Sequence, residues 1–274
     1  MDLYVVRHIS ESFFNVIVVG SAAALAAVAT YTAITRKRNF AVMAAVGFLL
    51  GFAFEAISVA VGFRDLSAVT VFGVRMPYPF PQVVMGLEGG VLIPLAGYWI
   101  GHCLARRKYA RAGGALAAVA VYSLAGCALT RYEIVRGARE ITSRREVFGP
   151  VAAVSLIVMV LVVAYALWKM QASGRRMFLL FLLGVFVVSS VWILGYRGFG
   201  LRVFEQLRSG GYVPASGPAT AVGLLYDIVV ELTLIDALFF LVPYSLGMLD
   251  VTEWSLTGDL RPRAPDDRTA RVGR

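Results

Sequence analysis

Residues 40–63 of the chain read FAVMAAVGFLLGFAFEAISVAVGF, and Glu55 is their single charged side chain. As a helix this stretch would be about 36 Å long at 1.5 Å per residue. That length is enough to cross the roughly 30 Å hydrocarbon layer of a bilayer. The stretch therefore predicts a transmembrane helix that carries a carboxylic acid within it.

Six further runs share this length and apolar character, so the sequence predicts an all-α, polytopic membrane protein, a bundle of seven transmembrane helices. The transmembrane domain would cover residues 1–249, and residues 250–274 would form a polar, disordered cytoplasmic tail. The seven expected spans are Ser12–Ile34, Phe40–Phe63, Gln82–Leu104, Ala110–Thr130, Phe148–Trp168, Met177–Tyr196 and Ala219–Leu246.

The composition excludes one packed soluble domain as the main architecture. Of the 274 residues, 59% are hydrophobic and 16% are charged, with a mean hydropathy of +0.74. A soluble domain carries about 25% charged residues. Seven spans leave no room for a separate soluble catalytic domain. We interpret the net charge of +9 as loops that face anionic lipid, not as a nucleic-acid surface.

The distribution of cations over the loops predicts an orientation. The short loops after the first, third and fifth expected spans, together with the tail, carry 15 Lys and Arg, against 11 on the opposite side. By the positive-inside rule, these loops and the C-terminus are cytoplasmic and the N-terminus is outside the cell membrane. The longer outer loops, residues 64–81 and 197–218, would cover the helix ends or cap a cavity.

Acidic residues inside the expected spans are the strongest functional signal. An acid in hydrocarbon is costly unless it is protonated, paired or placed in a cavity, and none of these spans has an internal Lys or Arg. Glu55, Glu88 and Asp227 would lie in one layer, roughly 9 to 12 Å beneath the outer surface. Glu231 lies one turn below Asp227 on the same helix face, whereas Asp236 points elsewhere and is expected outside the cluster.

Such a cluster suits acid–base chemistry. Crowded carboxyl groups in a water-poor site cannot all ionise, so one would remain a neutral proton donor. That donor could protonate an alkene or an epoxide, and an ionised neighbour could stabilise the cation or take the final proton. We therefore predict Glu55, Asp227, Glu88 and Glu231 as catalytic residues. The alternative is that these acids only form hydrogen bonds that stabilise helix packing.

Aromatic side chains near the same layer would contact the substrate. We expect Tyr226, Phe54 and Tyr78 to bind it, because aromatic faces stabilise cations. No metal and no organic cofactor are expected. The sequence has no HExxH motif or zinc-ligand spacing, and the last span lacks the lysine that retinal attachment needs.

The layout resembles the integral-membrane terpene cyclases of meroterpenoid and indole-diterpenoid pathways. The likeness consists of seven spans, a chain of this size, Glu55 in FAFEAISVAVG of the second span and Asp227 in LLYDIVVE of the last. In that family the two acids are implicated in protonating an epoxide or terminal alkene of a polyprenyl chain. The family's second-span motif resembles WEFVY, where this chain has FEAIS. The resemblance implies a proton-initiated cyclase of the isomerase or lyase type.

A weaker likeness is to membrane carotenoid hydratases, which place an acid before a Gly-rich, aromatic stretch. Here the corresponding residues would be Glu55, Gly62, the pair Phe72–Gly73 and Tyr78. Both likenesses imply a hydrophobic isoprenoid substrate taken from membrane lipid. The alternative from another class is a proton-coupled transporter or a subunit of a membrane complex, in which the same acids relay protons.

Overall fold

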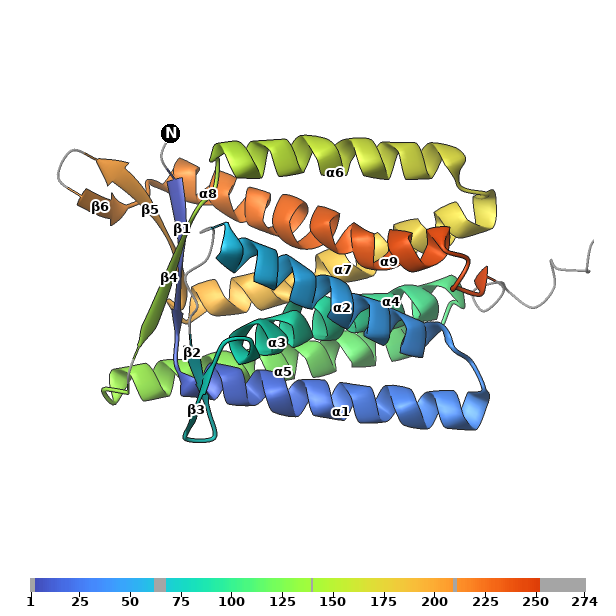
Figure 1. Cartoon of the computed structure of the whole chain (residues 1–274), viewed down its shortest axis with the longest axis horizontal. Coiled ribbons are helices and arrows are strands. Elements are labelled where there is room, and N and C mark those ends of the chain that lie inside the picture. The colour runs from blue at the N-terminus through green and yellow to red at the C-terminus, as the bar shows by residue number, and fades with distance from the viewer. Residues whose placement is uncertain (1–2, 62–67, 139, 209–210, 252–274) are drawn as a thin grey trace, which may run out of the picture.

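The computed structural model describes residues 3–61, 68–138, 140–208 and 211–251, and the predicted tail falls outside these ranges from residue 252 onward. The described chain is a bundle of helices with strands gathered at one end (Figure 1). The helices are α1 (Glu11–Thr35), α2 (Asn39–Ala60), α3 (Phe80–Leu87), η1 (Glu88–Leu92), α4 (Ile93–Ala105), α5 (Tyr109–Val135), α6 (Pro150–Lys169), α7 (Ala172–Gly198), α8 (Gly217–Tyr226), η2 (Asp227–Leu234) and α9 (Ile235–Ser245).

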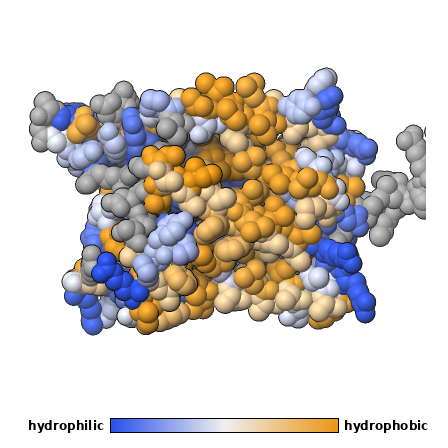
Figure 2. Space-filling model, viewed as in Figure 1, coloured by the Kyte–Doolittle hydropathy of each residue, from blue (hydrophilic) through white to orange (hydrophobic). Residues whose placement is uncertain are grey.

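Within the described ranges, six helices are long and apolar enough to cross a membrane, which agrees with the prediction of a helical membrane protein. One of them is the continuous run α3–η1–α4, and α8–η2–α9 forms a similar run from Gly217 to Ser245. A band of hydrophobic residues covers the middle of the face in Figure 2, with hydrophilic residues toward both ends.

The prediction of an all-α fold was incomplete, because segments assigned to the N-terminus and the outer loops pair as strands. A four-stranded antiparallel sheet has the order β4-β1-β5-β6. Its members are β1 (Leu3–Ile9), β4 (Ile141–Glu146), β5 (Arg202–Arg208) and β6 (Gly211–Pro214). These strands lie at one end of the bundle, here called the sheet end (Figure 1). Short loops between helices lie at the opposite end, the loop end, which contains residues 36–38, 106–108 and 170–171.

A separate hairpin at the sheet end joins α2 to α3. Its strands are β2 (Ala68–Val71) and β3 (Val74–Pro77), and its turn residues Phe72 and Gly73 both have positive φ, at 49° and 76°. A two-residue turn of this kind matches the natural twist of paired strands. The turn is fixed to α1, because Asn15 accepts a hydrogen bond from the Phe72 N–H and Glu11 accepts one from the Gly73 N–H.

The loop-end half of the bundle is filled by a hydrophobic core rich in aromatic rings. Phe178 and Phe181 of α7 contact Phe240 of α9, with ring centroids 5.5 and 5.4 Å apart. On the other side of this core, Phe40 of α2 packs edge-on against Tyr98 of α4 at 4.9 Å. These five rings are all buried, so the polar residues described below are confined to the half of the bundle nearer the sheet.

Glycines let α2 approach η1 at backbone distance. A Cβ atom on Gly47 would collide with the carbonyl oxygen of Gly90, and a Cβ on Gly90 would collide with the carbonyl oxygen of Gly47. Gly51 and Gly86 form the next close approach along the same helix pair. Because Glu55 and Glu88 lie on these two elements, the glycines set the separation between the two acids.

We expect Gly47→Ala to destabilise the protein by about 1 to 3 kcal/mol, because overpacking forces the two backbones apart. Gly113→Ala is the matched control, since a Cβ at Gly113 of α5 meets no atom within 4 Å. The measurement is thermal unfolding of both purified variants in the same detergent. Equal melting temperatures would show that the α2–η1 contact is looser than described.

Candidate functional site: a carboxylate–arginine centre beneath the sheet

Three arginines from three neighbouring strands lie on the sheet face that packs on the helices. Arg7 of β1 is directly opposite Arg202 of β5 and Ser143 of β4, and Arg145 lies two residues further along β4, opposite Val5. Since side chains alternate between faces with a period of two, the three arginines share the face of Val5. They also line one small cavity with Val5 and Ser143.

Asp227 is held by two of these arginines. The Arg202 guanidinium donates through Nε and Nη2 to the two Asp227 oxygens, both at 2.5 Å, and both side chains are nearly inaccessible to solvent. Arg145 Nη2 lies 3.4 Å from Oδ1 of the same carboxylate. A bidentate, charge-assisted pair of this geometry is the strong form of the interaction, and it holds Asp227 as a carboxylate.

Glu88 is held by contacts from both the sheet and the bundle. Arg7 Nη1 lies 3.8 Å from Glu88 Oε2, and the Trp192 indole of α7 donates to Glu88 Oε1 at 3.1 Å. Trp192 lies between Tyr122 and Tyr196, with ring centroids 5.9 and 5.5 Å away. Glu88 therefore has an arginine on one side and an aromatic stack on the other.

A cavity of about 50 Å³ brings three acids together with Arg7. Its lining includes Glu55 from α2, Glu88 from η1 and Asp236 from α9, and each of these acids is buried. The expectation that Asp236 lies outside the cluster was wrong, because the helix does not continue with α-helical spacing between Asp227 and Asp236. Asp227 is not part of this lining and belongs to the neighbouring pair with Arg202.

Two of the acids lie where the α-helical spacing is interrupted. Glu88 and Asp227 are the first residues of the two π-helical segments η1 and η2. Just after the first segment, Pro94 of α4 has no N–H to give to the Gly90 carbonyl. In the second, Thr233 Oγ1 donates to the Ile228 carbonyl at 2.7 Å. Wide turns of this kind occur often at functional sites and shift the helix faces that follow them.

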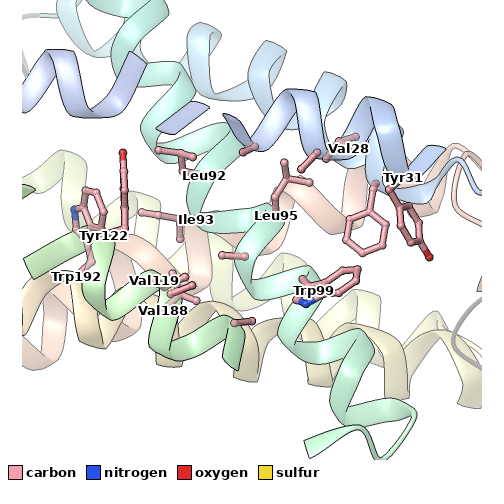
Figure 3. A pocket seen from close by; sticks show the side chains of 16 residues that line it. Val28, Tyr31, Leu92, Ile93, Leu95, Trp99, Val119, Tyr122, Val188 and Trp192 are labelled. Carbon is pink, nitrogen blue, oxygen red and sulfur yellow. The ribbon is translucent and has the colours of Figure 1, made fainter. Parts of the chain in front are cut away.

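Two apolar cavities adjoin this centre. One of about 160 Å³ lies between α2, α6 and η2, and its lining includes Phe54, Tyr226 and Arg145. The other, of about 540 Å³, lies among α1, α4, α5 and α7 (Figure 3). Ile93 lines both the 540 Å³ cavity and the cavity of the three acids, while Phe54 lines the 160 Å³ cavity and that same acidic cavity.

The predicted site residues are thus only partly brought together. Glu55 and Glu88 share one cavity, Asp227 lies in the adjacent ion pair, and Phe54 and Tyr226 line the 160 Å³ cavity. Tyr78 is 62% exposed beyond the end of β3 and lines none of these cavities. The backbone of Glu231 belongs to η2, but its side chain is outside the described residues, as is Gly62.

Sequence reasoning missed the arginines because it looked for cations only within the spans. The signal that would have found them is the strand-like pattern of LYVVRHI and RVFEQLR, residues 3–9 and 202–208. Arg7 lies two residues after Val5, and Arg202 lies two residues before Phe204, so each arginine is on the same strand face as that apolar residue. A β-branched or aromatic residue at every second position indicates a strand, and an arginine in that register faces the buried side.

A second polar contact lies on the other sheet face, outside the spans. The His8 ring, through Nδ1, contacts Glu140 Oε1. This hydrogen bond from His8 holds the pKa of Glu140 below its usual range. The contact joins β1 to the residue that precedes β4, so it stabilises the strand pairing and does not take part in the buried centre.

The fold and the site therefore define a helical membrane protein with buried carboxylates compensated by arginines of an adjoining sheet. In the part of the chain that the structure describes, no three His, Cys, Asp or Glu side chains are arranged to hold a metal ion. Comparisons with protein-family models, with curated proteins and with solved structures gave no match to this chain.

We expect Asp227→Asn to destabilise the protein by about 3 to 5 kcal/mol, because it removes the charge that accepts two hydrogen bonds from the buried Arg202 guanidinium. The double change Arg202→Leu with Asp227→Leu should recover most of this loss, since it removes both buried charges together. Arg145→Gln is the control, because its contact with Asp227 is longer.

The measurement is thermal unfolding of the full chain in detergent, arranged as a double-mutant cycle. If Asp227→Leu and Arg202→Leu prove additive in the double variant, the two side chains do not interact and the description of the pair is incorrect.

Proposed function

We propose that the protein is a membrane-embedded enzyme of the isomerase or lyase type that acts by acid–base catalysis on a hydrophobic isoprenoid substrate. Its most specific form is a proton-initiated terpene cyclase. The observation that supports this most directly is the cavity where Glu55, Glu88 and Asp236 meet Arg7. Carboxyl groups crowded in a water-poor site do not all ionise, and the proposal takes one of the three as a neutral proton donor.

The proposal assigns Glu55 as this donor. Glu88 already receives Arg7 and the Trp192 indole, contacts that stabilise a carboxylate. Glu55 lies next to Phe54, which lines both the acidic cavity and the 160 Å³ apolar cavity. A double bond or epoxide held in the apolar cavity would therefore lie beside the acid. Glu88, as a carboxylate, would stabilise the cation or take the final proton.

Substrate access is proposed to be lateral, between α2 and α6. The apolar cavity has walls from both helices, including Ile57 and Ser58 of α2 and Ala152 and Leu156 of α6. α6 lies at the edge of the bundle (Figure 1), and only 11% of its apolar window is buried. The reacting end of the chain would occupy the cavity while its remainder stays in lipid. The rings of Phe54 and Tyr226 would face the developing cation.

The resemblance to membrane terpene cyclases supports the same proposal at two positions. Glu55 keeps the role of acid. Asp227 receives a different one, because its bidentate pair with Arg202 leaves it a carboxylate. In this proposal Asp227 is a positioning residue that holds the sheet arginines above the cavity. The carotenoid hydratase alternative uses the same Glu55 and differs only in the final addition of water.

The transporter alternative is less well supported by the distribution of polar groups. A proton path should connect the two ends of the bundle with acids or water-filled space. The acids of the spans that have described side chains lie in the half nearer the sheet, whereas Phe178, Phe181 and Phe240 pack in the loop-end half. This arrangement favours a pocket that ends within the bundle and opens sideways to lipid.

The proposal includes a seventh span and an orientation. The run α8–η2–α9, residues 217–245, is long enough to cross the hydrocarbon layer, and it contains the three acids Asp227, Glu231 and Asp236. With seven spans the sheet end would face the outside of the cell membrane. The Arg- and Lys-rich loop end and the C-terminus would then face the cytoplasm.

We expect Glu55→Gln to abolish turnover while the melting temperature stays within a few degrees of wild type, because Gln keeps the size of the acid but cannot deliver a proton. Membranes that contain the protein would be incubated with prenylated and epoxidised prenyl substrates, and the products identified by mass spectrometry. Glu140→Gln is the matched control, since this exposed acid contacts His8 outside the bundle. An active Glu55→Gln enzyme would assign Glu55 to packing alone.

Reporter fusions test the topology. A fusion after Arg274 should report the cytoplasm, and one at Gly137, between α5 and β4, should report the outside. Both fusions reporting the same compartment would contradict an odd number of spans.

A further inference from the structure

The 540 Å³ cavity is a long channel parallel to the helices. Its lining runs from Ala24 to Tyr31 on α1 and from Leu92 of η1 to Trp99 of α4, a length of about 10 Å at 1.5 Å per residue. Figure 3 shows Trp192 and Tyr122 at one end and Tyr31 at the other. Helix direction places the Tyr31 end toward the loop end of the bundle.

The walls of this channel are hydrocarbon. Between the aromatic residues of its two ends, they consist of alanine, valine, leucine and isoleucine side chains. Ala27 of α1 and Ala118 of α5 line the channel and are exposed, so it is open to the surface of the bundle. The volume is within the range of about 300 to 1,000 Å³ that is usual for small-molecule sites. An apolar chain is therefore the ligand that these walls accept.

The loops next to the Tyr31 end of the channel are rich in cations. α1 ends in the loop with Arg36, Lys37 and Arg38, and α4 is joined to α5 by Arg106, Arg107 and Lys108. Thus the helices that form the channel carry both basic loops. Tyr31 and Trp99, whose ring centroids are 6.0 Å apart, form the neck between the loops and the channel. Basic clusters next to membrane helices bind anionic lipid headgroups.

The inner end of the channel lies about one leaflet away from the end of α1. From Thr35, the last residue of α1, to Ala24 at the inner end of the channel there are 11 residues, or about 16 Å of helix. Half of the roughly 30 Å hydrocarbon layer is about 15 Å. An acyl chain whose headgroup lies at the basic loops would therefore reach the inner end of the channel near Trp192.

We propose that this channel binds one acyl chain of an anionic phospholipid, with the phosphate group at loops 36–38 and 106–108. The site is separate from the catalytic cavity at Glu55 and does not depend on the proposed reaction. The occupant is a phospholipid of the bilayer, because the hydrocarbon walls, the one-leaflet distance from the basic loops to the inner end of the channel, and the cations beyond its other end together match a single amphiphile.

The experiment is native mass spectrometry of the delipidated full chain. It is titrated with phosphatidylglycerol or with phosphatidylcholine that has the same acyl chains. We expect one phosphatidylglycerol to be retained, at least about tenfold more tightly than phosphatidylcholine. The double change Arg38→Gln with Lys108→Gln should weaken phosphatidylglycerol by about fivefold for each charge removed, and leave phosphatidylcholine unchanged. Equal retention of the two lipids by the wild-type chain would overturn the proposal.

Variants of the channel wall test the position of the acyl chain. Ala118→Trp and the milder Ala118→Leu should lower retention of phosphatidylglycerol in proportion to the volume they add, and Ala27→Leu should act in the same way from α1. The controls are Ala117→Leu and Ala26→Leu, exposed neighbours on the same helices that do not line the channel. Wild-type retention by folded Ala118→Leu and Ala27→Leu variants would place the lipid elsewhere.

Discussion

The pair between Arg202 and Asp227 constrains the arrangement of the sheet on the bundle. A guanidinium that is 1% exposed has lost its hydration, and only a partner of opposite charge with good geometry offsets that loss. Arg202 belongs to a strand and Asp227 to a π-helical turn, so their pair joins the sheet directly to the bundle. The sheet is thereby fixed to the helices in one register, and a shift by one residue would turn Arg202 to the opposite face.

This constraint explains how acids are tolerated within apolar helices. The spans provide no cation of their own, but the sheet reaches over their ends and supplies Arg7 and Arg202 to Glu88 and Asp227. The charge of each acid is thus compensated by an arginine of the sheet, and not by a cation on a neighbouring helix. It leaves the cavity of Glu55, Glu88 and Asp236 at the boundary between the charged face of the sheet and the apolar interior of the bundle, which is where the proposed function places the reaction.

The sequence predicted the helices well and the sheet not at all, for a physical reason. A span such as 40–63 is determined locally, because length and hydropathy alone commit it to the bilayer, and the observed helix Asn39–Ala60 matches it closely. Strand pairing depends on partners far apart in the chain, and β1 pairs with segments that begin at residues 141 and 202.

The position of Asp236 was missed because the wide turn of η2 shifts every later residue around the helix axis. By contrast, the shared cavity of Glu55 and Glu88 follows from their equal depth and from the glycine contact between their helices.

Trp192 connects the two cavities that we assign to different ligands. Its indole N–H donates to Glu88, and its ring closes the inner end of the 540 Å³ channel beside Tyr122. Tyr122 is itself fixed, since its hydroxyl donates to the Val16 carbonyl of α1 at 2.7 Å. An acyl chain that fills the channel would press on the face of the indole and restrict its rotation, which keeps the hydrogen bond to Glu88 formed. Because Glu88 also receives Arg7, a bound lipid and the sheet would act on the same carboxylate, the lipid through Trp192 and the sheet through Arg7. If both proposals hold, lipid binding would influence the acidic cavity through this one aromatic side chain.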